Sequence, residues 1–258
     1  MVCCQEQHRA ELTQYLSQNI HFNIFILSDI QQYGFSNPNQ QVFMLPGSDG
    51  CIQGVCLRYY RNLLLTGKLP PPDALHSWVA TGVHTIMGEA DLIQQVGACL
   101  GDVGVYQEKR LLAQEKEWKG RGEVLPVRMA SVQDIDRIHA FLMTIPGFQQ
   151  LYGEKEMIYN RIVSGEGTHL YYEKDGKIIA HVNSAAATSQ ACMLGGLAVA
   201  PAYQARGLGT AMVSALCQRM VQQNRQIHVF TDCTSEYSLF DVLGFREIGK
   251  WGVISISG

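Results

Sequence analysis

Several kinds of segment are missing from this chain of 258 residues, and each absence excludes a class of protein. No uninterrupted apolar run approaches the ~20 residues that a membrane-spanning helix needs. The N-terminus, Met-Val-Cys-Cys-Gln-Glu, lacks the basic and then apolar order of a secretory signal. The net charge is only −3 and the isoelectric point about 6.2, so there is no basic footprint for nucleic acid. We therefore expect a cytoplasmic protein that binds neither nucleic acid nor membranes.

The eight cysteines also lack a metal-binding pattern. None forms a Cys-x-x-Cys pair, and no set of cysteine and histidine has the spacing of a zinc site. Several lie within apolar stripes, where a free thiol packs as a small hydrophobic group. The simplest interpretation is reduced thiols and no metal. The chain is 47% hydrophobic, which suits one large domain or two ordinary ones.

The most informative stretch runs from Leu197 to Thr210. It predicts an apolar strand that Pro201 stops, a short break, and then a helix. Gly207 and Gly209 leave the backbone bare where that helix begins, and Arg206 adds a charge with forked donors. Free helix amides and the helix dipole, together with these residues, predict a site for phosphate or pyrophosphate. The helix itself is predicted from apolar residues four apart: Leu208, Met212, Leu216 and Met220.

Other phosphate-binding loops fit this stretch less well. A dinucleotide-binding fingerprint needs three glycines directly after a strand, whereas Met212 stands where the third would be. The Gly-Lys-Ser or Gly-Lys-Thr of a P-loop is absent. An ordinary strand–loop–helix connection without a ligand stays open for a Gly-x-Gly pattern taken by itself.

A longer pattern resembles the acetyl-CoA site of the GNAT acetyltransferase superfamily. Val-x-Pro is followed by Gln-x-x-Gly-x-Gly, with Gln204, Gly207 and Gly209 at the three marked positions. Downstream, Ser238-Leu239-Phe240-Asp241-Val242-Leu243-Gly244-Phe245 resembles the family's Leu-Tyr-x-x-Leu-Gly-Phe segment. The resemblance covers the second half of the chain strongly and the first half weakly. It implies an α/β (α+β) fold and the transfer of an acetyl group from acetyl-CoA to a primary amine, by direct transfer in a ternary complex.

The order of predicted elements divides the chain into two similar halves. Each half has helices, a hairpin with Asp-Gly, an apolar strand, a helix and a strand, and the charged segment 115–122 between them lacks periodicity. We expect two GNAT-like mixed-sheet domains in tandem, at residues 1–122 and 123–258; coincidental similarity of two α/β units stays open. In the first half, Pro70, Pro71 and Pro72 remove amide donors from the corresponding loop, so this copy is expected to be degenerate.

Periodicity and turn residues place the individual elements. Asp73 is expected to cap a helix to about residue 80, and Ser131 with Asp134 resembles a capping box for the next domain's first helix. Residues 5–33 are predicted to be helical, with a buried second helix from about His21, and other helices are predicted at about 90–100, 154–163 and 236–243. Strands are predicted at 41–45, 51–60, 62–65, 83–87, 105–114, 168–173, 178–187, 191–200, 227–231 and 245–256.

The resemblance assigns roles to the strand before Pro201, to the loop and helix start after it, and to Phe240 further downstream. The backbone of Leu197, Ala198 and Val199 would pair with pantetheine and supply oxyanion donors. Phe240 would pack on the cofactor, but it stands where the family has its tyrosine acid and cannot donate a proton. The pyrophosphate would lie on the loop made by Gln204, Ala205, Arg206, Gly207, Leu208, Gly209 and Thr210.

The acid and the base are less clearly marked. Tyr237 precedes Phe240 by three residues, so on a helix both share nearly one face, and Tyr237 is the candidate catalytic acid. Its ordinary pKa of about 10 keeps it protonated at neutral pH. The alternatives are a half-buried helix residue with no catalytic role, and protonation by water or Ser238. The candidates for the base are Glu166, His169, His181, Asp232 and Glu236, with water as an alternative; histidines on strands are more often core residues.

The acceptor and the assembly are not specified by these motifs. We expect a small-molecule or peptide amine as the acceptor, and a monomer or homodimer. The alternative function is a non-catalytic module that senses or binds acyl-CoA, which Phe240 favours because the family's acid is lost there.

Overall fold

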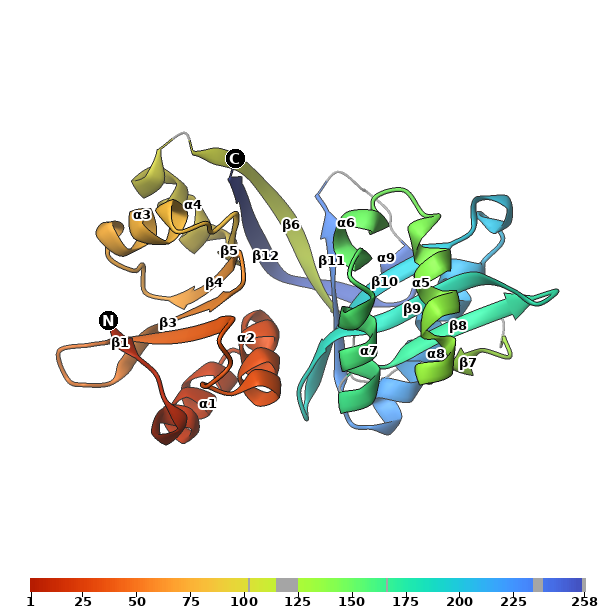
Figure 1. Cartoon of the computed structure of the whole chain (residues 1–258), viewed down its shortest axis with the longest axis horizontal. Coiled ribbons are helices and arrows are strands. Elements are labelled where there is room, and N and C mark those ends of the chain that lie inside the picture. The colour runs from red at the N-terminus through yellow and green to blue at the C-terminus, as the bar shows by residue number, and fades with distance from the viewer. Residues whose placement is uncertain (102, 115–124, 166, 234–238, 257–258) are drawn as a thin grey trace. The chain divides into compact units, whose positions relative to one another are not determined.

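The computed structural model describes residues 1–101, 103–114, 125–165, 167–233 and 239–256. The contacts within the chain divide it into two compact units, each a mixed sheet flanked by helices (Figure 1). Unit 1 comprises Met1–Leu111, Phe230–Ser235 and Glu247–Gly258, and unit 2 comprises Leu112–Val229 and Glu236–Arg246. Strands β6 (Gly104–Gln114), β11 (Gln226–Asp232) and β12 (Phe245–Ile256) therefore contribute residues to both units.

Unit 1 has the strand order β1-β2-β3-β4-β5-β12-β6. Its first four strands pair antiparallel, β4 pairs parallel with β5, and β12 pairs antiparallel with β5. The elements are β1 (Val2–Cys3), η1 (Glu6–His8), α1 (Arg9–Ser17), α2 (Ile20–Tyr33), β2 (Gln40–Pro46), β3 (Ile52–Tyr59), β4 (Asn62–Gly67), α3 (Pro72–Ala80), β5 (Thr85–Glu89) and α4 (Ala90–Leu100).

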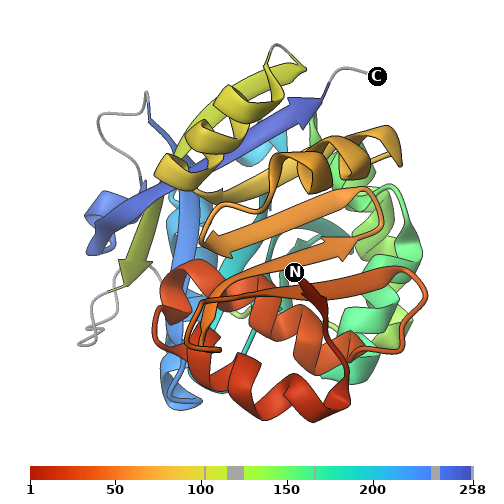
Figure 2. The same ribbon diagram turned by 90° about the vertical axis from the view of Figure 1, so that its left-hand side faces the viewer.

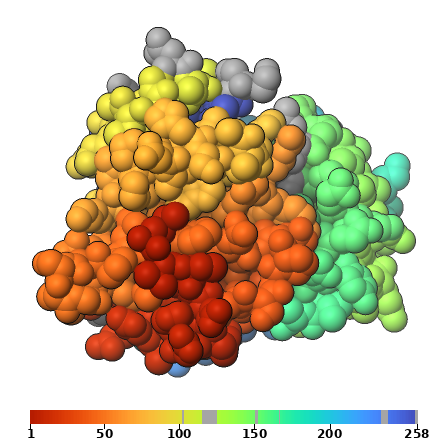
Figure 3. All heavy atoms as spheres, turned by 60° about the vertical axis from the view of Figure 1, so that its left-hand side comes forward, coloured from red at the N-terminus to blue at the C-terminus, as the bar shows by residue number. Residues whose placement is uncertain are grey.

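Helices cover both faces of the unit 1 sheet, which explains its continuous apolar strands. Successive side chains of a strand point to opposite faces. Leu63 and Leu65 pack in the cluster beneath α3 and α4, while Leu64 packs with α1 and α2. The two helix pairs are seen on either side of the strands in Figure 2, and Figure 3 shows the surface that α1, α3 and α4 present to solvent. A strand buried on both faces has to be apolar at every position.

Unit 2 has the strand order β6-β11-β10-β9-β8-β7, in which β10 and β11 are parallel and β7 to β10 are antiparallel. Two apolar clusters cover the two faces of this sheet, one beneath α8 and the other beneath α5 and α7. The elements are β7 (Arg128–Met129), η2 (Val132–Asp134), α5 (Ile135–Met143), α6 (Phe148–Tyr152), α7 (Lys155–Ser164), β8 (His169–Lys174), β9 (Lys177–Ala187), β10 (Ala191–Val199), η3 (Pro201–Tyr203), α8 (Leu208–Gln222) and α9 (Leu239–Val242).

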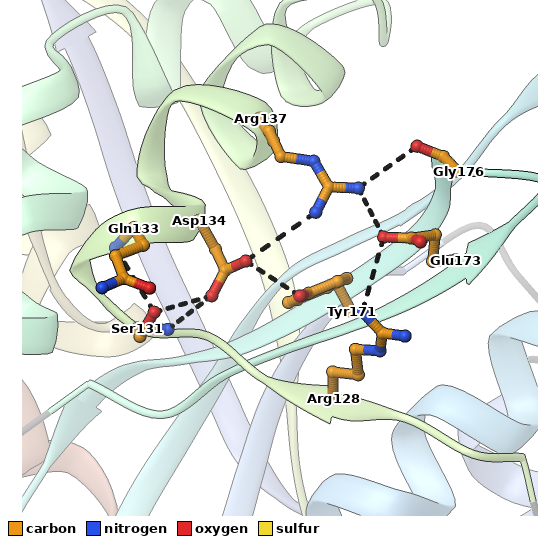
Figure 4. A network of polar contacts seen from close by, with 8 residues as sticks. All are labelled: Arg128, Ser131, Gln133, Asp134, Arg137, Tyr171, Glu173 and Gly176. Atoms are coloured by element: carbon orange, nitrogen blue, oxygen red, sulfur yellow. Dashed lines mark hydrogen bonds and ion pairs between the residues drawn. The ribbon is translucent and has the colours of Figure 1, made fainter.

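A polar network fixes the start of α5 to the β8–β9 hairpin (Figure 4). The Asp134 carboxylate accepts bonds from the Ser131 backbone and hydroxyl, at 2.9 and 2.8 Å, which confirms the predicted capping box. The same carboxylate accepts the Tyr171 hydroxyl at 2.9 Å. Arg137 ion-pairs with Glu173 and donates to the Gly176 carbonyl at 3.2 Å. The β8–β9 hairpin is therefore bonded to the start of α5 both through strand β8, at Tyr171 and Glu173, and through its turn, at Gly176.

Most predicted elements are present; the short strands β1 and β7 were not predicted, and two helices differ from the prediction. Pro71, not Asp73, is the N-cap of α3, because Pro72 is preset for the first helical position and starts the helix two residues earlier. Asp73 lies in the first turn, where its charge still complements the helix dipole. The short helix α6 was not predicted; it begins at Gly147, whose φ of 83° is left-handed.

The predicted boundary between residues 122 and 123 lies outside the described residues, as does the predicted linker. The two units differ from a division into 1–122 and 123–258, because β12 pairs with β5 over residues 251–255 and counts with unit 1 from residue 247 on. All eight cysteines are free, as expected. In the described parts of the chain, no helix has the length and apolar character that crossing a membrane requires.

Candidate functional site

The parallel strands β10 and β11 of unit 2 separate part of the way along their length. Their pairing runs from Ala191↔Gln226 to Met193↔His228, while β10 continues to Val199. On its other edge β10 stays paired with β9 as far as Val199↔Ala180. The Ala200 N–H donates to the Ile179 carbonyl of β9 at 2.8 Å, so strand alternation turns the Val199 N–H to the opposite edge. The second half of β10 thus has backbone groups on the edge where β11 no longer pairs with it.

A β-bulge lies where this opening begins. The register steps from Gly195↔Asn183 to Ala198↔His181, so β10 has one residue more than β9 over this interval. Gly196 adopts a left-handed φ of 55°, and a Cβ there would lie 2.1 Å from Asn183 Oδ1. Bulges bend a strand and change the direction of its backbone groups. Glycine is therefore required at this turn of the strand.

After β10, the loop to α8 presents a row of unused amide donors. The Gln204 side chain bridges back to the Val199 carbonyl at 3.1 Å and closes the start of the loop. Ala205 and Gly207 both have left-handed φ angles, 57° and 80°, with Arg206 between them. The first helical amide with a backbone acceptor is that of Ala211, which donates to Gly207. Among the described residues, none accepts a hydrogen bond from the amides of residues 205–210.

This geometry suits an anion. Left-handed turns beside a helix start gather N–H groups into a concave nest, and the helix dipole adds a partial positive charge. Nothing lies within 4 Å of a Cβ built on Gly207, so the backbone there is open to a ligand. The residues predicted to hold pyrophosphate, Gln204 to Thr210, are thus brought together in one exposed or half-exposed loop.

Two cations share one aromatic ring at the edge of this loop. The Arg206 guanidinium lies 5.7 Å from the centre of the Tyr203 ring, and Lys174 Nζ lies 5.6 Å from it. Each contact is favourable by itself, but like charges on one ring repel, so an anion between them would be stabilised. Lys174 was not predicted, because the hairpin that carries it has no phosphate-binding motif.

Comparison with known proteins agrees with this geometry. A family model described as the acetyltransferase (GNAT) family matches residues 135–245. The chain carries a GNAT acetyltransferase domain. No curated protein matches the chain.

Solved structures of GNAT proteins share the fold over nearly the whole chain. A tandem GNAT protein from the clavulanic acid biosynthesis pathway has 10% identity and a TM-score of 0.61, covering 98% of this chain and 96% of that one. A GCN5-related N-acetyltransferase-like protein from Streptococcus suis has 12% identity and a TM-score of 0.63, with coverages of 97% and 99%. A GNAT-family acetyltransferase from Colwellia psychrerythraea has 15% identity and a TM-score of 0.59, with coverages of 95% and 97%. The predicted α/β fold with two GNAT-like units in tandem is confirmed.

The corresponding strands and loop of unit 1 have neither GNAT feature. There β4 pairs with β5 from Asn62↔Thr85 to Leu65↔Gly88, so only its last two residues extend beyond the pairing, whereas β10 extends six residues beyond its pairing with β11. A Cβ on Gly67, the last residue of β4, would lie 2.2 Å from the Tyr15 hydroxyl, and the next amide, that of Lys68, donates to the Gln53 carbonyl at 2.8 Å. The loop's prolines remove further donors.

The residues downstream of β11 are only partly described. Phe240 is 8% exposed and packs edge-on against Phe245, 5.4 Å away, within the core cluster of α8. A Cβ on Gly209 would lie 3.8 Å from Leu239, so α9 packs beside the start of α8. Contact between Phe240 and the cofactor stays a prediction. Tyr237, the predicted acid, lies outside the described residues, as do Ser238, Glu166 and Glu236.

The remaining candidates for the base have clear surroundings. Asp232 forms an ion pair with Lys109 and is largely exposed. His169 and His181 are almost completely buried, as expected of core histidines. Burial, together with His181 and Arg161, lowers the pKa of His169 to about 2, and burial lowers that of His181 to about 4. Both are weak bases in this position. The part of the chain that the structure describes contains no group of side chains suited to a metal ion.

Proposed function

We propose that the protein is an N-acetyltransferase that moves an acetyl group from acetyl-CoA to a primary amine, by direct transfer in a ternary complex. The observation that carries this proposal is the opening between β10 and β11, which leads into a loop of unused amide donors. The proposal is supported by the GNAT family match over residues 135–245.

In this proposal the two parts of the site have different tasks. Of the three residues predicted to pair with the pantetheine arm and donate to the developing oxyanion, Leu197 and Val199 have that role in this proposal, because the backbone of Ala198 pairs with His181 of β9. The amides from Ala205 to Thr210 hold the pyrophosphate, closed by Gln204 and assisted by Arg206. Acetyl-CoA supplies the activated acyl group. Lys174 adds a second positive charge at the phosphate end.

Proton transfer requires two further groups. The acceptor amine must be neutral to attack, and a base or a water chain removes its proton. The leaving thiolate, with a pKa of about 8.5, needs only modest help from an acid. Tyr237 is the proposed acid. Changing Tyr237→Phe should lower kcat about 10²–10⁴-fold with little change in acetyl-CoA affinity, and adding Phe240→Tyr should restore part of it. A near-normal kcat for Tyr237→Phe would leave solvent as the proton source.

The binding site is tested by isothermal titration with acetyl-CoA. A side chain at Gly207 would fill the space in which the phosphate approaches the backbone, so Gly207→Val should abolish measurable binding. Gly147→Val is the matched control, because Gly147 is also a left-handed helix N-cap with open space around it. Equal affinities of the two variants would contradict the proposed site.

The alternative function is an acyl-CoA-binding module without catalysis. Phe240 favours it, because the aromatic residue at the family's acid position carries no hydroxyl and is buried in the core. Release of CoA in the presence of a panel of small-molecule and peptide amines separates the two functions. Turnover with any of these amines supports the transferase, whereas tight binding without turnover supports the sensor.

We also propose that unit 1 does not bind acetyl-CoA. The loop after β4 loses donors to its prolines and to the bond from the Lys68 amide to Gln53, and β4 extends only two residues beyond its pairing with β5. The expected stoichiometry is therefore one acetyl-CoA per chain, which the same titration measures.

A further inference from the structure

A buried cluster of polar side chains lies directly behind the bulge of β10 in unit 2. It contains Tyr152 from α6, His169 from β8, and His181 and Asn183 from β9, all around Gly196. His169, His181 and Asn183 are each at most 1% exposed. Burying so many polar groups is costly unless each has a partner, so their hydrogen bonds indicate what the cluster does.

The hydrogen bonds of the two histidines can run in one direction only. His181 Nδ1 lies 2.8 Å from the Gly196 carbonyl, which can only accept, so Nδ1 carries the proton. His181 Nε2 is then the acceptor of the neutral ring. His169 Nδ1, 3.0 Å away, must donate to it. The chain of donors runs from His169 through His181 to the Gly196 carbonyl, and both tautomers are fixed.

The surroundings keep both rings neutral, as this arrangement requires. Burial is the main reason that the pKa values of both histidines lie well below 6.5. The charged group that acts on the pair is Arg161, which further lowers the pKa of His169. Tyr152 stays protonated because burial raises its pKa, and it donates to Asn183 Oδ1 at 3.0 Å. His169 Nε2 is left with a lone pair and has no hydrogen-bond partner among the described residues.

The bond to Gly196 determines where the next amide points. The Gly196 carbonyl and the Leu197 N–H belong to one planar trans peptide, in which they point in opposite directions. Because the His181 ring holds the carbonyl, the Leu197 N–H points away from that ring. The neighbour of β10 on the other side is β11, which pairs with β10 only as far as Met193. The side chains of Tyr152 and Asn183 occupy the space that a Cβ on Gly196 would take.

We propose that His181 is a positioning residue, which aims the Leu197 amide at the thioester end of acetyl-CoA, and that His169 acts through it by fixing its tautomer. This inference rests on the proposed function, and goes beyond it by assigning the orientation of one donor to a pair of buried side chains. Neither histidine touches the substrate or takes up a proton.

The test compares three variants of the full chain. His181→Asn keeps a donor near the position of Nδ1, His181→Leu removes it, and Val182→Ala creates a cavity on the same strand without touching the donor chain. A preorganised oxyanion donor is worth about 10²–10³ in kcat, so its misorientation in His181→Leu should lower kcat at least about tenfold. His181→Asn should recover most of this loss. Val182→Ala should lower the melting temperature and leave kcat per folded molecule near the wild-type value.

A readout without turnover separates this inference from the proposed function. Nitrogen-15 NMR of the histidine rings should show both His169 and His181 protonated at Nδ1 at neutral pH. Acetyl-CoA titration of the wild type tests the proposed function independently. If acetyl-CoA binds and turns over but His181→Leu and His181→Asn are equally active per folded molecule, the positioning role is overturned. An Nε2-protonated His181 would overturn it as well, even in the absence of any turnover.

Discussion

Among single residues, Gly196 and Gly207 both have a positive φ, but their surroundings are opposite. Both have a left-handed φ, yet a Cβ on Gly196 would collide with Asn183 while one on Gly207 would meet open space. The first glycine is required by the fold, and the second is open to a ligand. The sequence motif marked only Gly207. Gly196 follows another glycine in a strand, and a spacing rule cannot show that a buried polar cluster fills the space beside it.

The contrast predicts different losses of stability. A left-handed non-glycine residue costs about 1–2 kcal/mol, and overpacking of a filled site adds about 1–3 kcal/mol. Gly196→Ala should therefore lower the free energy of unfolding by about 2–5 kcal/mol, and Gly207→Ala by about 1–2 kcal/mol. Urea denaturation of both variants without ligand measures this. Equal losses would mean that the cluster can move aside.

The buried histidines predict how stability depends on pH. The folded-state pKa of His181, about 4, lies below its ordinary value of 6.5, so the unfolded chain binds the proton more readily. Stability is fully present above pH 6.5 and is lost as the pH falls toward 4. Lowering the pH from 7 to 5 should therefore reduce the free energy of unfolding by on the order of 2 kcal/mol through His181. Urea denaturation at both values should show a smaller loss in His181→Asn than in the wild type. An unchanged loss would mean that His181 is not held neutral.

At the scale of elements, the β8–β9 hairpin brings a residue from another part of the chain to the phosphate loop. The Asp134 and Arg137 network fixes this hairpin, and Lys174 near its turn reaches the Tyr203 ring. The strand, the loop and α8 could be predicted because each has a local pattern. The role of Lys174 could not be predicted, because its position beside Tyr203 depends on the register between β9 and β10. That register cannot be derived from residue spacing within the hairpin.

Lys174 therefore provides a test of the hairpin's role. Lys174→Ala should weaken acetyl-CoA binding by about 1 kcal/mol, roughly fivefold in Kd, as expected for an exposed charge. Lys177, across the turn of the same hairpin, makes no contact with Tyr203 or Arg206 among the contacts described, so Lys177→Ala is the control. Titration at low and high salt should show the difference shrinking as salt screens the charge. Equal affinities at low salt would exclude Lys174 from the site.

At the scale of the whole chain, the division into domains was the least predictable feature. The elements of each half were predicted in the correct order, but the last strand counts mostly with unit 1 because it pairs with β5. The apolar pattern of a strand is the same whichever strand it pairs with, so the pattern of β12 could not show its partner. The predicted division at residue 122 rested on the repeated order of elements and on the charged segment between them.

The strands that contribute to both units predict how the chain unfolds. Strands β6, β11 and β12 each contribute residues to both units, so neither unit consists of one continuous stretch of chain. If unit 1 unfolded, each of these strands would be unfolded over its unit 1 residues, and its unit 2 residues would become a shortened strand. We therefore expect one cooperative transition in calorimetry, with equal calorimetric and van't Hoff enthalpies.

A variant in β12 tests whether the two units unfold together. Trp251 is 3% exposed and packs with Phe22, Phe25 and Phe230 in unit 1. Trp251→Ala should cost about 3–5 kcal/mol and shift the whole transition to lower temperature. Amide protection should then fall together in β4 of unit 1 and β9 of unit 2, because both report the same global opening. Two separate transitions, with only unit 1 shifted by Trp251→Ala, would show instead that the shared strands do not couple the units.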